Sequence, residues 1–356
     1  MHFLPDLLQI DTATPLPAEA RILVLYTGGT FGMVLDEEDH LVPFDFSQIL
    51  EQVPELIHFN YQLDIAQFAS PIDSSNIAPA HWVAIARQIE KHYHNYDGFV
   101  VLHGTDTMAY SASALSFMLQ NLQKPVVFTG AQVPIGRFRT DARYNLITAL
   151  EVAGARRNQQ PAIPEVCICF GNMVVRGNRA KKTETSHFDA FKSENYPALA
   201  EAGAEIEYFA NYIRQNPAQN PFNVWTELEE RVMIVKLFPG LSETVLRNLI
   251  LNSGMKGIVL ETFGSGNAPT QPWFLNCLKE AINAGIYILN VSQCDEGRVD
   301  QGKYKTSKYL KELGVIGGGD ITAEAAITKL MAVLALNLPP EKTRTLLANP
   351  MAGEMS

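Results

Sequence analysis

The chain has 356 residues, 47% of them hydrophobic, and a formal net charge of −10. This length exceeds what one hydrophobic core usually supports, which predicts two domains, and the ordinary content of charged residues, Gly and Pro argues against disorder. The acidic balance argues against nucleic acid as a partner, because proteins that bind polyanions gather Lys and Arg on one face. A small-molecule partner is favoured.

The first eleven residues, MHFLPDLLQID, have no basic segment, and Pro5 and Asp6 interrupt their apolar stretch. They predict neither a signal peptide nor a membrane span, so we expect a cytoplasmic protein with no membrane partner. The cysteines lie in or near apolar runs without zinc-type CxxC spacing, which predicts reduced, mostly buried thiols. They are Cys167, Cys169, Cys277 and Cys294.

Short apolar runs rich in Val and Ile predict buried parallel strands. In chain order these runs are ILVLY at 22–26, FVVLHG at 99–104, PVVFTG at 125–130 and VCICFG at 166–171. Residues with helical spacing lie between them, which predicts βαβ units. The expected fold is therefore α/β, with a larger N-terminal domain whose mostly parallel sheet is flanked by helices.

The pattern breaks at NPAQNPFN, where two prolines and several amides predict a linker at 206–230. Apolar runs at 232–240, 257–264 and 286–294 then predict a smaller C-terminal parallel-sheet domain, closed by a helix at 321–336. The predicted domains are thus 1–205 and 231–356. The one basic cluster is predicted to be a solvated loop; it comprises Arg176, Arg179, Lys181 and Lys182.

Hydroxyl and amide side chains follow the first three predicted strands. The strands end in TGGT at 27–30, HGTDT at 103–107 and TGAQ at 129–132. Ligands bind at the carboxyl ends of parallel strands, and paired glycines let a backbone approach a ligand closely. Thr105 and Asp106 also suit the alternative role of helix caps. A site that holds a polar substrate accounts better for hydroxyls on both sides of the Asp.

Three segments together resemble the cytoplasmic type I bacterial L-asparaginases: YTGGTFGM, HGTDTMAYSASALSFML and GNRAKKTETSHFDAF. The likeness extends to SGNAP and GVIGGGDIT and spans nearly the whole chain. It implies that Thr30 attacks the side-chain amide of L-asparagine and forms an acyl-enzyme. Thr105, Asp106 and Lys182 would form a second polar triad that relays protons, since a hydroxyl nucleophile needs a proton acceptor.

The same resemblance implies a substrate-binding set. Ser74 would bind the α-carboxylate and Asp106 the α-ammonium of the substrate, with neutral donors at one end and a carboxylate at the other. The remaining members are Gly29, Asp73, Ser75, Ala131 and Asn267. Without the family, the segment DSSN would be read as a turn. Asn267 corresponds to a residue presented to a neighbouring subunit, which implies a homodimer; pairing of two dimers into a tetramer stays open.

Two departures from the family pattern bear on activity. Family members carry a tyrosine on the loop after the first motif, and here His40, another loop residue or Tyr26 would have to replace it. Glu261 and Lys181 stand where the family's effector site has arginine and threonine. Because an acid repels the carboxylate of an asparagine effector, we expect weak or absent homotropic activation.

Alternatives on the same scaffold are a glutaminase-asparaginase, an amidotransferase-type amidase and a non-catalytic amino-acid sensor. Asparagine and glutamine differ by one methylene group, so the sequence pattern alone does not decide which of the two amides is preferred. Residues two apart on a helix face different directions, so the histidines of His92-Tyr93-His94 do not predict a metal site. We expect no metal and no cofactor.

Overall fold

The computed structural model describes residues 2–10, 12, 18–35, 41–43, 46–215, 220–302 and 305–356. The chain divides into two compact units, one formed by Met1–Ser193 with Pro197–Thr226 and one by Glu194–Tyr196 with Glu227–Ser356. Residues 206–230, predicted as a linker, contain two short strands that pair within the first unit. Over the described ranges, no helix is both long and apolar enough to cross a membrane.

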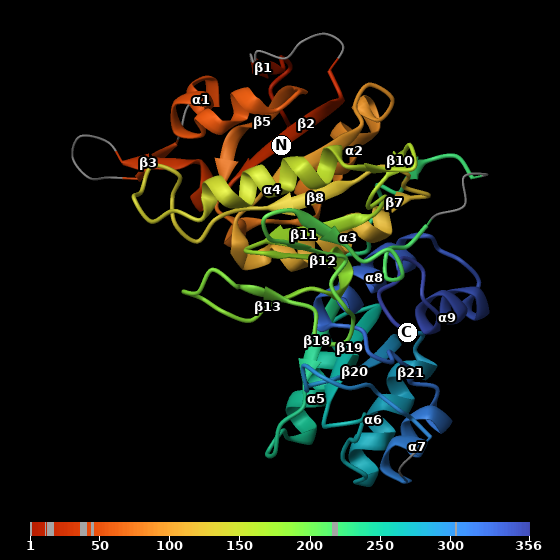
Figure 1. The fold of residues 1–356 in the computed structure, drawn as a ribbon. Coiled ribbons are helices and arrows are strands. Elements are labelled where there is room, and N and C mark those ends of the chain that lie inside the picture. The colour runs from red at the N-terminus through yellow and green to blue at the C-terminus, as the bar shows by residue number, and fades with distance from the viewer. Residues whose placement is uncertain are drawn as a thin grey trace. The chain divides into compact units, whose positions relative to one another are not determined.

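The first unit is built on a nine-stranded sheet in the order β1-β5-β2-β6-β8-β11-β12-β15-β16 (Figure 1). Its five central strands, β5 to β11 in this order, are parallel, and the flanking strands pair antiparallel. The bounds are β1 Leu8–Ile10, β2 Ala20–Gly28, β5 Tyr61–Ile72, β6 Gly98–Leu102, β8 Val126–Thr129, β11 Val166–Phe170, β12 Met173–Arg176, β15 Ala200–Ala202 and β16 Ile206–Tyr208. The four predicted strands of this domain are confirmed.

The sequence patterns do not identify β5. Gln62, Asp64 and Gln67 interrupt its apolar residues. Asp64 is nevertheless buried, because the Tyr96 hydroxyl donates a hydrogen bond to its carboxylate at 2.8 Å. A hydrogen bond between distant residues thus permits a charged residue inside a strand.

Among the described residues of this unit, four small pairs of strands lie outside the large sheet. They are β3 Met33–Leu35 with β4 Leu41–Pro43, β7 Leu119–Gln120 with β17 Asn223–Val224, β9 Arg156–Arg157 with β10 Gln160–Pro161, and β13 Lys181–Lys182 with β14 Phe191–Lys192. The pair β13–β14 carries Lys182, one of the predicted site residues.

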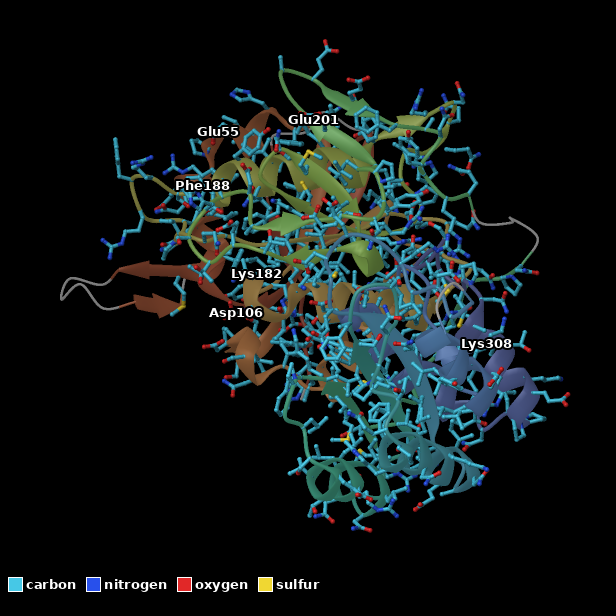
Figure 2. The ribbon with its side chains drawn as sticks, turned by 90° about the horizontal axis from the view of Figure 1, so that it is seen from below. Glu55, Asp106, Lys182, Phe188, Glu201 and Lys308 are labelled. Carbon is cyan, nitrogen blue, oxygen red and sulfur yellow. The ribbon has the colours of Figure 1, made fainter. Side chains whose placement is uncertain are left out.

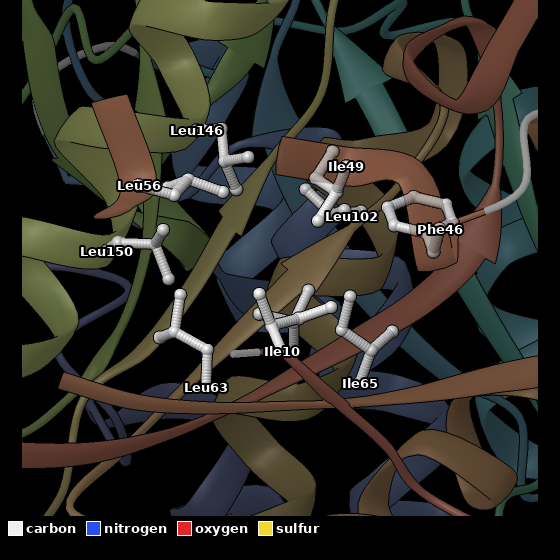
Figure 3. A pocket seen from close by; sticks show the side chains of 10 residues that line it. Ile10, Phe46, Ile49, Leu56, Leu63, Ile65, Leu102, Leu146 and Leu150 are labelled. Carbon is white, nitrogen blue, oxygen red and sulfur yellow. The ribbon is translucent and has the colours of Figure 1, made fainter. Parts of the chain in front are cut away.

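Helices connect the parallel strands and cover the sheet. They are α1 Ile49–Gln52, α2 Pro79–His92, α3 Met108–Met118 and α4 Ala142–Gly154. Figure 3 shows side chains of α1, α4, β1, β5 and β6 around an apolar cavity of about 10 Å³, too small for a ligand. Every residue of β6 is buried, as expected for a strand covered on both faces.

The strand order reverses beside β2. The chain runs from β2 to β5 on one side, and then places β6 on the other side of β2. In open α/β sheets, such a reversal opens a crevice at the carboxyl ends of the strands, where ligands bind. The loops after β2, β5 and β6 are therefore expected to form the site.

The second unit has a parallel sheet in the order β18-β19-β20-β21, which confirms the three predicted strands and the α/β class. Its elements are β18 Val232–Lys236, β19 Gly257–Thr262, β20 Tyr287–Ser292, β21 Ile316–Gly317, α5 Glu243–Leu251, α6 Pro272–Asn283, α7 Lys305–Leu313, α8 Ala323–Ala335 and α9 Pro340–Ala348. The predicted closing helix is α8. Its Lys329 forms a fully buried ion pair with Glu354, at 2.6 Å between Nζ and Oε1.

Three of the four cysteines are buried, in agreement with the predicted mostly buried thiols. Cys167, Cys169 and Cys277 are buried and free, whereas Cys294 is free and exposed. Burial raises the pKa of Cys169 to about 12, so this thiol stays protonated.

Candidate active site

Three loops meet where their glycines allow backbone contact. A Cβ atom on Gly29 would lie 2.5 Å from Cα of Gly104, and one on Gly104 would lie 2.5 Å from Oγ of Ser74. Gly29 also has a φ of 86°, which favours glycine, and its N–H donates to the Ile72 carbonyl at 3.1 Å. The ends of β2, β5 and β6 are thus in close contact, with no room for a side chain at Gly29 or Gly104.

A pocket of about 520 Å³ opens at this junction. Its lining comes from five segments of the first unit: Gly29, Thr30, Met33, Ser70, Pro71, Ile72, Asp73, Ser74, Gly104, Thr105, Asp106, Gln132, Lys182 and Thr185. The predicted nucleophile and all three residues of the predicted triad are among them. A pocket of this size accommodates a small molecule.

The triad is joined by hydrogen bonds from Lys182. Its Nζ donates to Oγ1 of Thr105 at 2.8 Å and to Oδ1 of Asp106 at 2.7 Å. Figure 2 shows Asp106 and Lys182 side by side. The Lys182 side chain is 17% exposed and that of Asp106 is 64% exposed, so the pair lies between the protein interior and solvent. This geometry connects a proton donor, a hydroxyl and a carboxylate in one cluster.

Thr105 and Asp106 do not cap the helix that follows. The short helix η5, Thr105–Thr107, begins after Gly104, and α3 begins after Thr107, without a side-chain cap in either case. The Thr107 hydroxyl donates to the Ser74 carbonyl at 2.8 Å instead. The capping alternative is therefore wrong, and both residues remain directed to the cluster with Lys182.

Thr30 is the first residue of a short helix, η1, Thr30–Gly32. Below it, the Tyr26 hydroxyl donates to the Gly32 carbonyl at 3.2 Å, and the Tyr26 ring packs against Phe46. Burial raises the pKa of Tyr26 to about 12, so this phenol is protonated at neutral pH and supports the loop from inside. His40, the other candidate for the missing loop tyrosine, lies outside the described residues.

The segment after β5 contains both a turn and pocket residues. Asp73 accepts hydrogen bonds from the N–H and the hydroxyl of Ser75, each at 2.9 Å, and the backbone bond is the main reason why its pKa is lowered. This is the turn that the sequence DSSN suggests. Asp73 and Ser74 also line the pocket, whereas Ser75 is directed to Asp73 and does not.

The segment after β8 contributes Gln132 to the pocket lining, and Ala131 is buried beside it. The sequence motif TGAQ includes Gln132, whereas the family resemblance implies Ala131 as the substrate-binding residue of this motif. Asp141 fixes this segment, because its carboxylate accepts hydrogen bonds from the N–H groups of Gln132 and Val133 at 3.0 to 3.1 Å. The position of Gln132 directly after a predicted strand is the sequence signal for this residue. Its hydrogen-bond partners follow only from the tertiary structure.

A buried chain of hydrogen bonds ends at Gly104. Trp82 donates to Ser111 at 2.8 Å, Ser111 contacts Nε2 of His103 at 2.9 Å, and Nδ1 of His103 contacts the Gly104 carbonyl at 2.7 Å. A carbonyl only accepts, so Nδ1 carries the proton and Nε2 accepts from Ser111. Burial lowers the pKa of His103 to about 4, which keeps it neutral. The neutral ring fixes the peptide between Gly104 and Thr105.

Two further predictions concern residues away from the pocket. The basic cluster is not a solvated loop, because Arg176 and Arg179 are 4% and 2% exposed, and Arg176 pairs with the buried Glu165. A buried partner far along the chain compensates that charge. Asn267 lies in the second unit, where its backbone pairs with that of Phe263.

Comparison with known proteins identifies the family of the chain. Residues 21–214 match the family model described as asparaginase, N-terminal, and residues 231–347 match the glutaminase/asparaginase C-terminal domain. The chain therefore belongs to the asparaginase family, and the resemblance seen in its sequence motifs is confirmed.

Individual relatives cover nearly the whole chain. L-asparaginase 1 of Escherichia coli is 41% identical over 338 residues, covering 94% of this chain and 98% of the relative. The crystal structure of L-asparaginase I from Vibrio cholerae has a TM-score of 0.85 at 39% identity, covering 95% of this chain and 99% of that one. The thermostable L-asparaginase from Thermococcus kodakarensis has the same TM-score at 33% identity, covering 94% and 99%.

Proposed function

We propose that the protein hydrolyses L-asparagine to L-aspartate and ammonia through an acyl-enzyme on Thr30. One observation carries the proposal: Thr30 meets the cluster of Thr105, Asp106 and Lys182 around a single pocket. The chain belongs to the asparaginase family, whose relatives include L-asparaginase 1 of Escherichia coli.

The reaction has two steps. In the first, the Thr30 hydroxyl loses its proton and attacks the side-chain amide carbon; the C–N bond breaks and the nitrogen leaves as ammonia after taking up a proton. In the second, water attacks the Thr30 ester, which releases the carboxyl group of aspartate and returns a proton to Thr30. Both steps need a group that accepts and returns protons, and we assign this role to the hydrogen-bonded cluster of Thr105, Asp106 and Lys182, which lines the same pocket as Thr30.

The substrate is a zwitterion, and its two charges have complementary partners in the pocket. We assign Ser74 to the α-carboxylate and Asp106 to the α-ammonium. Gly29 and Asp73 line the same pocket. Ser75 donates a hydrogen bond to Asp73, and Ala131 is buried next to Gln132 in the chain. Asn267 would complete the site of a second copy in a homodimer, and the cytoplasm is the proposed compartment.

Ammonia release from L-asparagine tests the proposal, with L-glutamine and D-asparagine as competing substrates. We expect turnover of L-asparagine by the wild type, loss of at least about 1,000-fold in Thr30→Ala, and retained activity in Thr30→Ser, which keeps the hydroxyl. An active Thr30→Ala variant would exclude the acyl-enzyme on this residue. Binding without turnover in the wild type would favour the amino-acid sensor instead.

The same rate curves test the effector prediction. Because Glu261 replaces the arginine of the family's effector site, we expect a hyperbolic dependence of rate on asparagine concentration. A sigmoidal curve would contradict this expectation.

A further inference from the structure

Gln132 connects the triad to the hairpin that carries Lys182. Its Oε1 lies 3.3 Å from Oγ1 of Thr105, and its Nε2 donates to the His187 carbonyl at 3.2 Å. His187 belongs to the segment between β13 and β14, and Lys182 lies in β13. One amide side chain therefore contacts the proton-relay hydroxyl with one end and the lysine's hairpin with the other.

The chemistry of these groups fixes the direction of each hydrogen bond. The His187 carbonyl only accepts, so the Gln132 amide must turn its NH₂ group to it and its carbonyl oxygen to Thr105. The Lys182 ammonium only donates, so Thr105 accepts from it and gives its single hydrogen to Gln132. Gln132 thereby keeps the lone pairs of Thr105 directed to Lys182.

The position of Gln132 is itself fixed by buried groups. The Asp141 carboxylate holds the Gln132 N–H, and Asn145 donates to Asp141 at 3.1 Å and to the Gly130 carbonyl at 2.9 Å. Asp141 is 7% exposed and Asn145 is fully buried. This shell fixes the backbone of Gln132, and the hydrogen bonds to Thr105 and the His187 carbonyl hold the two ends of its side chain, as precise orientation of a reacting group requires.

We propose that Gln132 is a positioning residue of the hydrolysis: it orients the Thr105 hydroxyl toward Lys182 and ties Lys182's hairpin to the pocket. The inference rests on the proposed function. Without Gln132, the Thr105 hydroxyl rotates freely and the proton relay loses its alignment. The groups assigned to the substrate's α-carboxylate and α-ammonium, Ser74 and Asp106, stay in place.

Steady-state kinetics on Gln132→Met test this role, because methionine keeps the length of the side chain without its hydrogen bonds. We expect kcat for L-asparagine to fall about 10- to 100-fold while KM stays within about threefold, since proton transfer suffers and substrate binding does not. Gln120→Met is the matched control. Gln120 is also half-buried and donates one hydrogen bond to a carbonyl, that of Phe117, but does not line the pocket.

A double-mutant comparison separates positioning from general destabilisation. In a Thr105→Val background, where the hydroxyl is absent, adding Gln132→Met should not lower the residual rate of aspartate formation further. Unchanged kcat in Gln132→Met, or an equal loss of kcat in Gln120→Met, would overturn the proposal for Gln132 alone. An inactive wild type would refute the proposed function itself and the role of Gln132 with it.

Discussion

Acid should weaken the first unit through His103, a residue that does not line the pocket. Its imidazole is fully buried and neutral, held between Ser111 and the Gly104 carbonyl. Burial lowers its pKa from 6.5 to about 4 on folding. Between these values the unfolded chain binds a proton at His103 that the folded chain does not, so stability must fall as the pH falls.

The size of the effect follows from the two pKa values. The free energy of unfolding is little affected by His103 above pH 6.5. Protonation of His103 in the unfolded chain lowers it by about 2 kcal/mol at pH 5 and by about 3 kcal/mol at pH 4. We therefore expect the free energies of unfolding of the wild type and His103→Asn to differ by an amount that depends on pH. Asparagine keeps a donor for the Gly104 carbonyl but has no proton to bind in this range.

Urea unfolding at pH 7, 6, 5 and 4 measures this difference, followed by the fluorescence of the first unit's tryptophans, Trp82 and Trp225. At pH 7 we expect His103→Asn to be the less stable protein, because Ser111 loses its acceptor. The gap should then narrow by about 3 kcal/mol between pH 7 and pH 4. Two parallel stability curves would show that His103 does not couple folding to protonation, and the reasoning would be wrong.

Two other substitutions test the geometry at the site and in the second unit. Gly29→Ala should reduce asparagine turnover at least about 100-fold, because the new methyl group would overlap the Gly104 backbone at 2.5 Å and displace the Thr30 loop. Lys329→Met should lower the free energy of unfolding of the second unit by about 3–5 kcal/mol, because it leaves the Glu354 carboxylate buried without its counter-charge. Hydrogen exchange of peptides from that unit reports the change.

Each of these substitutions has a control in the chain. Gly285 has the same φ of 86° as Gly29 but no atom within 4 Å of an added Cβ, so Gly285→Ala carries the backbone strain alone. Equal activity in the two alanine variants would contradict the steric argument. For the ion pair, replacing both Lys329 and Glu354 by Met should destabilise less than Lys329→Met alone. A single-variant cost below about 1 kcal/mol would disprove the burial argument.

The residue pattern alone predicts the α/β class, most of the parallel strands and the segments that form the pocket. Apolar runs of Val and Ile identify strands buried on both faces, and the residues directly after them lie at one edge of the sheet, because parallel strands end there together. For the same reason, Thr30 and Thr105 are recognisable as neighbours in space although 75 residues separate them along the chain.

Which polar side chains lie in contact with one another depends on the folded chain. Asp64 within β5, the buried Arg176 and the neutral His103 contradict simple patterns, because hydrogen bonds and an ion pair that form only in the folded chain compensate their burial. Gln132 contacts Thr105 across 27 residues and the Lys182 hairpin across 55. Hydrogen-bond partners depend on distances of about 3 Å and on direction, and residue order alone carries neither.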